Sequence, residues 1–171
     1  KIELNSKIYS LTDLPLIGEH NFKNYVCAIL AAQLEGINIS DSIKSLKNFF
    51  GVKRRMELVA NINGTQIYDD FAHHPTAILH TVKATVSHFP SKRIFGIIEL
   101  ASNTMSKGYH GEKLYKTTSD LKKAYWLNLS GKKNQKFEYD SLNLLLDDLK
   151  KEINNFDVIL IMSNKNSKKI S

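Results

Sequence analysis

From Met56 onward, apolar residues alternate between a pattern with the period of a strand and one with the period of a helix. Short runs rich in β-branched and aromatic residues predict strands at 56–62, 65–68, 93–99, 124–129 and 157–162. Apolar positions three and four residues apart predict helices at 76–88, about 110–119 and 141–154. Strands that alternate with amphipathic helices are typical of an α/β fold with a mostly parallel sheet and helices on both faces.

The first two predicted strands are separated only by Asn63-Gly64, a dipeptide that favours a tight hairpin turn. Two strands joined by such a short turn run antiparallel. We therefore expect a Rossmann-like, mostly parallel sheet with an antiparallel hairpin at one edge.

Residues 1–51 follow a different pattern and predict a separate piece of structure. A helical stripe covers 21–35, and Ser40 is expected to cap a second helix that stops at Gly51. Two short helices cannot enclose a core by themselves. Residues 1–51 are therefore interpreted as the tail end of one domain whose body would lie upstream, and residues 52–171 as a second domain.

The densest cluster of polar side chains lies where a predicted strand gives way to a predicted helix. Asp69 and Asp70 follow the strand, and His73 and His74 precede Pro75, which suits the first turn of a helix. Such a turn is a usual place for a ligand in an open α/β sheet. The alternative is that an aspartate caps the helix and the histidines are surface polar groups. Two carboxylates and two imidazoles on one turn favour a binding site.

The other predicted parallel strands also end in polar loops, at 99–103, at 128 and at 163–164. Because parallel strands end at the same edge of a sheet, we expect these loops to share one rim. The sequence contains neither the G-x-G-x-x-G fingerprint nor a P-loop, and no set of His, Cys and carboxylate residues has a dependable metal spacing.

Composition and charge limit the class of protein, its cellular compartment and the ligands to expect. With 42% apolar residues the chain can build a core, and no apolar run is long enough to predict a membrane span. The single cysteine, Cys27, is expected to be a small buried side chain; one cysteine and the lack of a signal peptide favour a cytoplasmic protein. The net charge of +7 is scattered and suits an anionic small molecule. Nucleic acid is a weaker alternative, since aromatic and basic residues do not interleave.

Four segments, in order along the chain, resemble the Mur ligase family of ATP-dependent amide ligases of peptidoglycan synthesis. They are Gly18-Glu19-His20-Asn21-Phe22-Lys23-Asn24, Gly51-Val52-Lys53-Arg54-Arg55-Met56-Glu57, the run DDFAHHPTAI at 69–78, and Ser102-Asn103-Thr104-Met105. The resemblance implies that residues 1–51 are the C-terminal end of the central ATP-binding domain. Residues 52–171 would then be the C-terminal, peptide-binding domain, and the P-loop would lie upstream.

The same resemblance implies roles for nine residues. ATP would be contacted by Asn21 and Asn24 at the adenine, by Arg55 at the phosphates or ribose, and by Asp70 at the ribose. The peptide would be contacted by His73, His74, Thr76, Ser102 and Asn103. Mg²⁺ would be held mainly by ATP and the upstream P-loop, and no residue of this chain need be a nucleophile. The residues alone leave alternatives open: a helix cap for Asn21 and Ser102, and a surface ion pair with Glu57 for Arg55.

The versions of these segments are similar to the branch of the family that joins the tripeptide L-Ala-γ-D-Glu-meso-diaminopimelate to UDP-N-acetylmuramate, through an acyl phosphate, in peptidoglycan recycling. The chain would then be an inactive C-terminal part of such a ligase, with UDP-N-acetylmuramate, the tripeptide and upstream domains as partners. Alternatives are the branch that adds L-alanine, and a non-catalytic basic module for nucleotides or nucleic acid. Leu100-Ala101 and the loop 163–169, which lacks glycine, depart from the family pattern and bear on peptide specificity.

Overall fold

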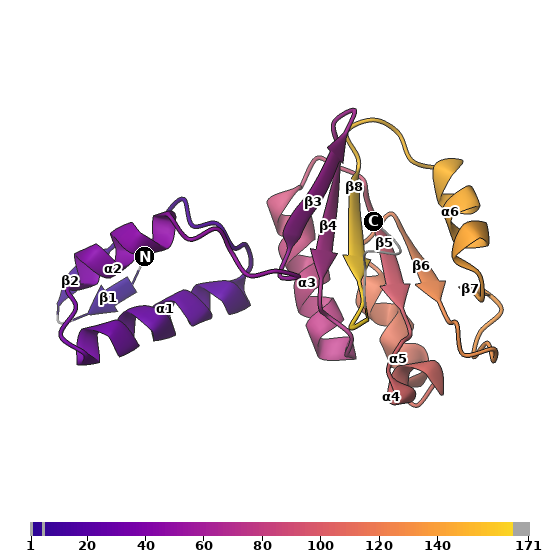
Figure 1. The fold of residues 1–171 in the computed structure, drawn as a ribbon, viewed down its shortest axis with the longest axis horizontal. Helices are drawn as coiled ribbons and strands as arrows, with labels where there is room; N and C mark the ends of the chain where they lie inside the picture. Colours follow the sequence, from indigo (N-terminus) through magenta and orange to yellow (C-terminus); the bar gives the residue numbers. More distant parts are fainter. Residues whose placement is uncertain (1, 5, 166–171) are drawn as a thin grey trace. The chain divides into compact units, whose positions relative to one another are not determined.

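The computed structural model describes residues 2–4 and 6–165, and the chain divides into two compact units, residues 1–52 and 53–171 (Figure 1). The first unit contains a small antiparallel hairpin and two helices. Its elements are β1 (Ile2–Leu4), β2 (Lys7–Tyr9), α1 (Glu19–Leu34) and α2 (Ile39–Lys47).

Helices α1 and α2 pack around a small core in which Tyr25, Ile29 and Ile39 are buried. The predicted cap of α2 was wrong. Asn38 is the cap, because its side-chain oxygen accepts a hydrogen bond from the backbone N–H of Ser40 at 2.8 Å. The helix also ends at Lys47, short of Gly51.

Cys27 is exposed on α1, so the prediction that it is buried was wrong. The buried face of this helix is formed by Asn21, Tyr25 and Ile29, which are spaced four residues apart. Cys27 lies midway between two of these positions and therefore points away from that face.

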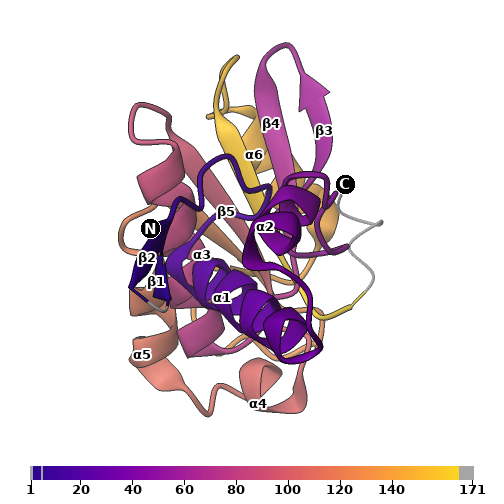
Figure 2. The same cartoon turned by 90° about the vertical axis from the view of Figure 1, so that its left-hand side faces the viewer.

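The second unit is a six-stranded sheet with helices on both faces (Figures 1 and 2). Its elements, in chain order, are β3 (Glu57–Ile62), β4 (Thr65–Asp70), α3 (Pro75–His88), β5 (Ile94–Glu99), α4 (Asn103–Ser106), α5 (Gly111–Tyr115), the 3₁₀ helix η1 (Lys116–Thr118), β6 (Lys123–Leu127), β7 (Glu138–Tyr139), α6 (Leu142–Lys150) and β8 (Val158–Met162).

The strand order is β3-β4-β8-β5-β6-β7. Strand β3 pairs antiparallel with β4 at one edge, and every other pairing is parallel. Asn63 and Gly64 join β3 to β4 with φ values of 52° and 85°, the left-handed backbone that a tight hairpin turn needs. The expected α/β fold, with its mostly parallel sheet and antiparallel edge hairpin, is confirmed.

Alternate residues of the central strands face two different helical layers. On one face, side chains of β5, β6 and β8 pack with α6 in a cluster made of Phe95, Ile97, Tyr125, Leu127, Leu145, Leu149, Ile159 and Ile161. On the other face lie α3, whose Ile78 and Val82 are fully buried, and α5, where the Tyr115 ring stands edge-on to the Trp126 ring at 4.9 Å. Each strand therefore contributes to two cores.

Several helices of this unit are short, and sequence periodicity did not predict all of them. The single helix expected near 110–119 is divided into α5 and η1, and α4 and the two-residue strand β7 were not predicted. Elements of two to five residues span too little of a period to be recognised. No helix among residues 2–4 and 6–165 is long and apolar enough to cross a membrane.

Gly96, in the middle of β5, leaves no room for a side chain. A Cβ atom there would lie 2.6 Å from Cδ1 of the buried Leu121. We expect Gly96→Ala to lower the free energy of unfolding by about 1–3 kcal/mol, because packed side chains must shift. Urea denaturation followed by the fluorescence of Trp126, which is the only tryptophan and is buried in the neighbouring strand, measures this change.

The matched control is the same substitution in a Leu121→Ala background. There Gly96→Ala should cost clearly less, since the obstructing methyl group is gone. An equal cost in both backgrounds would show that Leu121 is not the obstacle.

Candidate functional site at the carboxyl ends of the parallel strands

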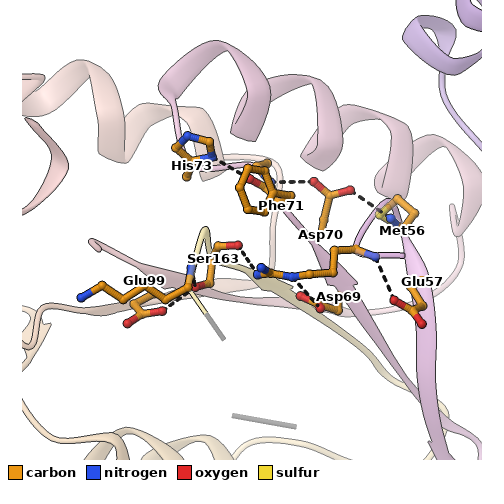
Figure 3. Close-up of polar contacts among 11 residues, drawn as sticks. Met56, Glu57, Asp69, Asp70, Phe71, His73, Glu99 and Ser163 are labelled. Carbon is orange, nitrogen blue, oxygen red and sulfur yellow. Dashed lines mark hydrogen bonds and ion pairs between the residues drawn. The ribbon is translucent and has the colours of Figure 1, made fainter. Parts of the chain in front are cut away.

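Strands β4, β8 and β5 lie side by side and end at the same edge of the sheet. Asp70 of β4 is in register with Met162 of β8, and Met162 is also in register with Ile98 of β5. The residues that follow these strand ends include Phe71, His73 and Ser163, and Figure 3 shows them gathered at this rim. The prediction that the polar loops meet at one edge is confirmed.

Asp69 and Asp70 are neighbours in β4 and therefore point to opposite faces of the sheet. The Asp70 carboxylate lies on the α3 side and is only 3% exposed. Its Oδ2 accepts a hydrogen bond from the N–H of Met56 at 2.9 Å, and its Oδ1 accepts one from the N–H of Ala72 at 2.9 Å and one from the Thr81 hydroxyl at 3.3 Å. Asp70 thus ties β4 to the segment before β3, to the following loop and to α3.

Burial raises the pKa of the Asp70 carboxyl above its ordinary value. The hydrogen bonds from Ala72, Met56 and Thr81, and the positive charge of Arg55, act in the opposite direction without cancelling the effect of burial. Arg55 itself is exposed. Its guanidinium is therefore available to a ligand at a position where its charge is felt by Asp70.

The side chain of Arg54, rather than that of Arg55, makes contacts within the protein. Its Nε donates to Oδ2 of Asp69 at 3.2 Å, its Nη2 donates to the backbone carbonyl of Ser163, and its guanidinium carbon lies 5.0 Å from the centre of the Phe71 ring. The side chain of Arg54 is 26% exposed and that of Asp69 is 5% exposed, so this ion pair is partly shielded from water. Arg54 consequently links the ends of β4 and β8.

Ser163 connects this ion pair to the end of β5. Its hydroxyl donates to Oε2 of the buried Glu99 and accepts a hydrogen bond from the N–H of Lys165 at 3.0 Å. Asp69, Arg54, Ser163 and Glu99 therefore form a continuous line of polar contacts across three adjacent strand ends, of which Figure 3 labels Asp69, Ser163 and Glu99. Residues 166–169 of the loop that departs from the family pattern lie outside the described residues.

The imidazoles of the cluster stack along the loop that leads into α3. Nδ1 of His73 lies 2.7 Å from the carbonyl oxygen of Phe71, and the ring centres of His73 and His74 are 4.5 Å apart. The ring of His110 stands edge-on to that of His74 at 6.3 Å. His73 is half-buried and His74 is exposed, and these rings can meet a ligand from the solvent side.

Three further residues predicted to contact the peptide lie on helical segments near the strand ends. Thr76 is exposed in the first turn of α3, and Asn103 is exposed at the start of α4. Ser102 caps α4, because its hydroxyl accepts a hydrogen bond from the N–H of Met105 at 3.3 Å. The capping role weighed from sequence is thus present in the structure, and the peptide contacts stay predictions.

Asn21 and Asn24 belong to the first unit. Asn21 is buried within α1 and is not its cap, which is Gly18. Its amide nitrogen donates to the carbonyl of Ile17 at 2.7 Å, while its oxygen accepts from the exposed amide of Asn24 at 3.4 Å. The two amides are therefore paired with each other, and their contact with adenine stays a prediction.

Sequence reasoning missed Arg54, Glu57 and His110 as parts of this rim. Oε2 of Glu57 accepts a hydrogen bond from the N–H of Arg54 at 2.8 Å, whereas the sequence suggested an ion pair between Glu57 and Arg55. No periodicity separates two adjacent arginines. The available signal was the hairpin register, which places Glu57 opposite Asp69, because two like charges directly opposite each other are unfavourable unless donors lie nearby.

The rim presents one exposed guanidinium, imidazoles and hydroxyls, a set that suits anionic and polar ligands. Among the residues that the structure describes, no group of three or more His, Cys, Asp and Glu side chains could hold a metal ion. The arrangement can therefore bind, orient and neutralise charge.

Replacing Asp70 by asparagine tests the role of its carboxylate in the fold. Both oxygens face backbone N–H groups, so in Asp70→Asn the amide nitrogen must face a donor, and we expect a loss of about 1–3 kcal/mol of unfolding free energy. Because the folded-state pKa is raised, the stability that Asp70 contributes is fully present below its unfolded pKa and declines as the pH rises through its folded pKa. The advantage of the wild type over Asp70→Asn should therefore shrink between pH 3 and pH 7 in chemical denaturation; an advantage that grows would contradict a raised pKa.

Comparison with known sequences identifies the family. The profile described as Mur ligase, glutamate ligase domain, matches residues 54–165. UDP-N-acetylmuramate–L-alanyl-γ-D-glutamyl-meso-2,6-diaminoheptandioate ligase of Haemophilus influenzae is 41% identical over 100 residues, which are 58% of this chain and 22% of that protein. The matched region spans about a fifth of the length of this relative and of its Escherichia coli counterpart.

Solved structures show the same relationship. A murein peptide ligase from Psychrobacter arcticus is 31% identical with a TM-score of 0.62, covering 86% of this chain and 34% of that one. UDP-N-acetylmuramate–alanine ligase from Thermotoga maritima shares the fold at 19% identity, with a TM-score of 0.69 over 98% of this chain and 39% of that one. Because the family profile covers nearly all of the second unit and well over half of the sequence, this chain belongs to the Mur ligase family.

Proposed function

We propose that this chain is the C-terminal part of an ATP-dependent ligase that joins the tripeptide L-alanyl-γ-D-glutamyl-meso-diaminopimelate to UDP-N-acetylmuramate in peptidoglycan recycling. The observation that carries the proposal is the 41% identity over 100 residues to a relative of that name. Residues 1–51 would complete a central ATP-binding domain, and residues 52–171 would be the peptide-binding domain. We place the enzyme in the cytoplasm, where ATP is available.

ATP, with Mg²⁺ held mainly by upstream residues, would supply the phosphoryl group that activates the muramate carboxylate. The exposed guanidinium of Arg55 fits an anionic phosphate. The amides of Asn21 and Asn24 have the donor and acceptor that a base edge requires. Asp70 would reach a ribose only after giving up hydrogen bonds that it makes in this structure.

The peptide would lie along the loop into α3 and along α4. His73, His74 and Thr76 would meet it on one side and Ser102 and Asn103 on the other, all of them at least partly accessible. None of these residues needs to form a covalent bond. Their task would be to hold the attacking amine in position and to exclude water from the activated carboxylate.

Amide formation tests the proposal directly. The 171-residue chain, given ATP, Mg²⁺, UDP-N-acetylmuramate and the tripeptide, should form no product, because it has no P-loop. The protein extended upstream through a glycine-rich loop ending in Gly-Lys-Thr should form the UDP-linked tripeptide, detected by mass spectrometry alongside release of ADP.

L-Alanine is the matched control substrate in this assay. A higher kcat/KM for L-alanine than for the tripeptide would assign the protein to the alanine-adding branch. Product from the chain alone would show that the upstream part is not needed. Salt-dependent binding to single-stranded nucleic acid without any ligase product would support the non-catalytic alternative.

A further inference from the structure

The turn that opens the second unit has an unusual backbone. Arg54 and Met56 both lie in the left-handed region, with φ values of 59° and 50°, where residues other than glycine are uncommon. Arg55 lies between them. Two such residues on either side of one arginine are costly for the chain, so the surroundings must hold them in place.

Three hydrogen bonds fix the backbone of this turn. The N–H of Arg54 donates to Oε2 of Glu57 at 2.8 Å, and the N–H of Met56 donates to Oδ2 of Asp70 at 2.9 Å. The carbonyl of Arg54 accepts from the N–H of Phe71 at 2.8 Å. Two of the three partners are carboxylates, which form stronger hydrogen bonds than neutral acceptors do.

The two arginines of the turn have different surroundings. The Arg54 side chain is held by Asp69, by the Ser163 carbonyl and against the Phe71 ring, so it acts as an anchor. The Arg55 side chain is exposed. Figure 3 shows Met56, Glu57, Asp69, Asp70 and Ser163 around this turn at the strand ends.

We propose that Glu57 and Arg54 are positioning residues: they hold a strained turn so that the Arg55 guanidinium is presented at the rim to the phosphates of a nucleotide. The identity of the ligand rests on the proposed function, whereas the construction of the turn does not. When the turn is already ordered, less conformational entropy is lost as the arginine is fixed on binding, and the affinity for the ligand is higher.

The order of the turn can be measured in the 171-residue chain without any ligand. Glu57→Ala should lower the backbone order parameters of residues 54–56 from near 0.85 to below about 0.6, and speed exchange of the Arg54 amide hydrogen about tenfold or more. The amide of Ile97, in the buried centre of the sheet, reports whether the fold is intact. Glu112→Ala, at an exposed glutamate of α5, is the matched control and should change neither. An ordered turn in Glu57→Ala would overturn the inference.

A double-mutant cycle in the upstream-extended protein tests whether Glu57 acts through Arg55. Glu57→Ala and Arg55→Ala should each raise the KM for ATP about tenfold with a smaller change in kcat, and the double variant should be no worse than Arg55→Ala. Glu57→Gln should recover most of the loss, because its amide oxygen still accepts the hydrogen bond. If the KM of the double variant rose by the product of the two single-variant increases, Glu57 and Arg55 would act independently and the inference would be overturned.

The two measurements separate the inference from the function on which it draws. If the extended wild type forms no amide, the proposed ligase function fails, and the order measurement alone decides whether Glu57 holds the turn. If the wild type is active but Glu57→Ala leaves both the turn and the KM for ATP unchanged, the ligase function stands and the positioning role is wrong.

Discussion

The Asp70 carboxylate accepts hydrogen bonds from three segments that meet at the end of β4: the turn before β3, the loop into α3, and α3 itself. A buried carboxylate is tolerated when its oxygens face donors, and each oxygen here faces at least one. The raised pKa shows that burial still dominates its electrostatics. Because one rigid group joins the three segments, the turn, the loop and the helix cannot shift independently, and the geometry of the rim depends on this contact.

A second set of polar contacts joins the strand ends to one another. Asp69, Arg54, Ser163 and Glu99 run across β4, β8 and β5 on the side of the sheet opposite to Asp70 and α3. Below this line the strands are held by apolar packing, which fixes their spacing but offers no chemistry to a ligand. The rim is therefore a polar layer supported by a core, and it leaves Arg55 and the imidazoles accessible above polar groups that are bonded to one another.

The sequence was sufficient for features that arise from local periodicity. Helical spacing located α1, α3 and α6, and Asn63-Gly64 located the hairpin, because in each case neighbouring residues carry the signal. It was insufficient where two nearby residues are equivalent in the sequence and contacts with distant residues determine which of them takes a given role. Arg54 and Arg55 are identical in type, and only the approach of Asp69 and the Ser163 carbonyl makes one an anchor. Likewise, Asn38 and Ser40 are both good caps, and Cys27 and Ile29 are both apolar side chains of one helix. Tertiary packing decided which residue caps α2 and which side chain of α1 is buried.

Strand β8 lies between β4 and β5, yet it follows both of them in the sequence. During translation, the backbone groups of β4 and β5 that pair with β8 stay unpaired, and their apolar side chains stay exposed, until residues 158–162 emerge from the ribosome. A ribosome that stopped before residue 158 would release a protein lacking the middle of its sheet rather than an edge. Such a product would resemble two incomplete half-sheets, and the quality-control proteases of a cell would meet it as an unfolded chain.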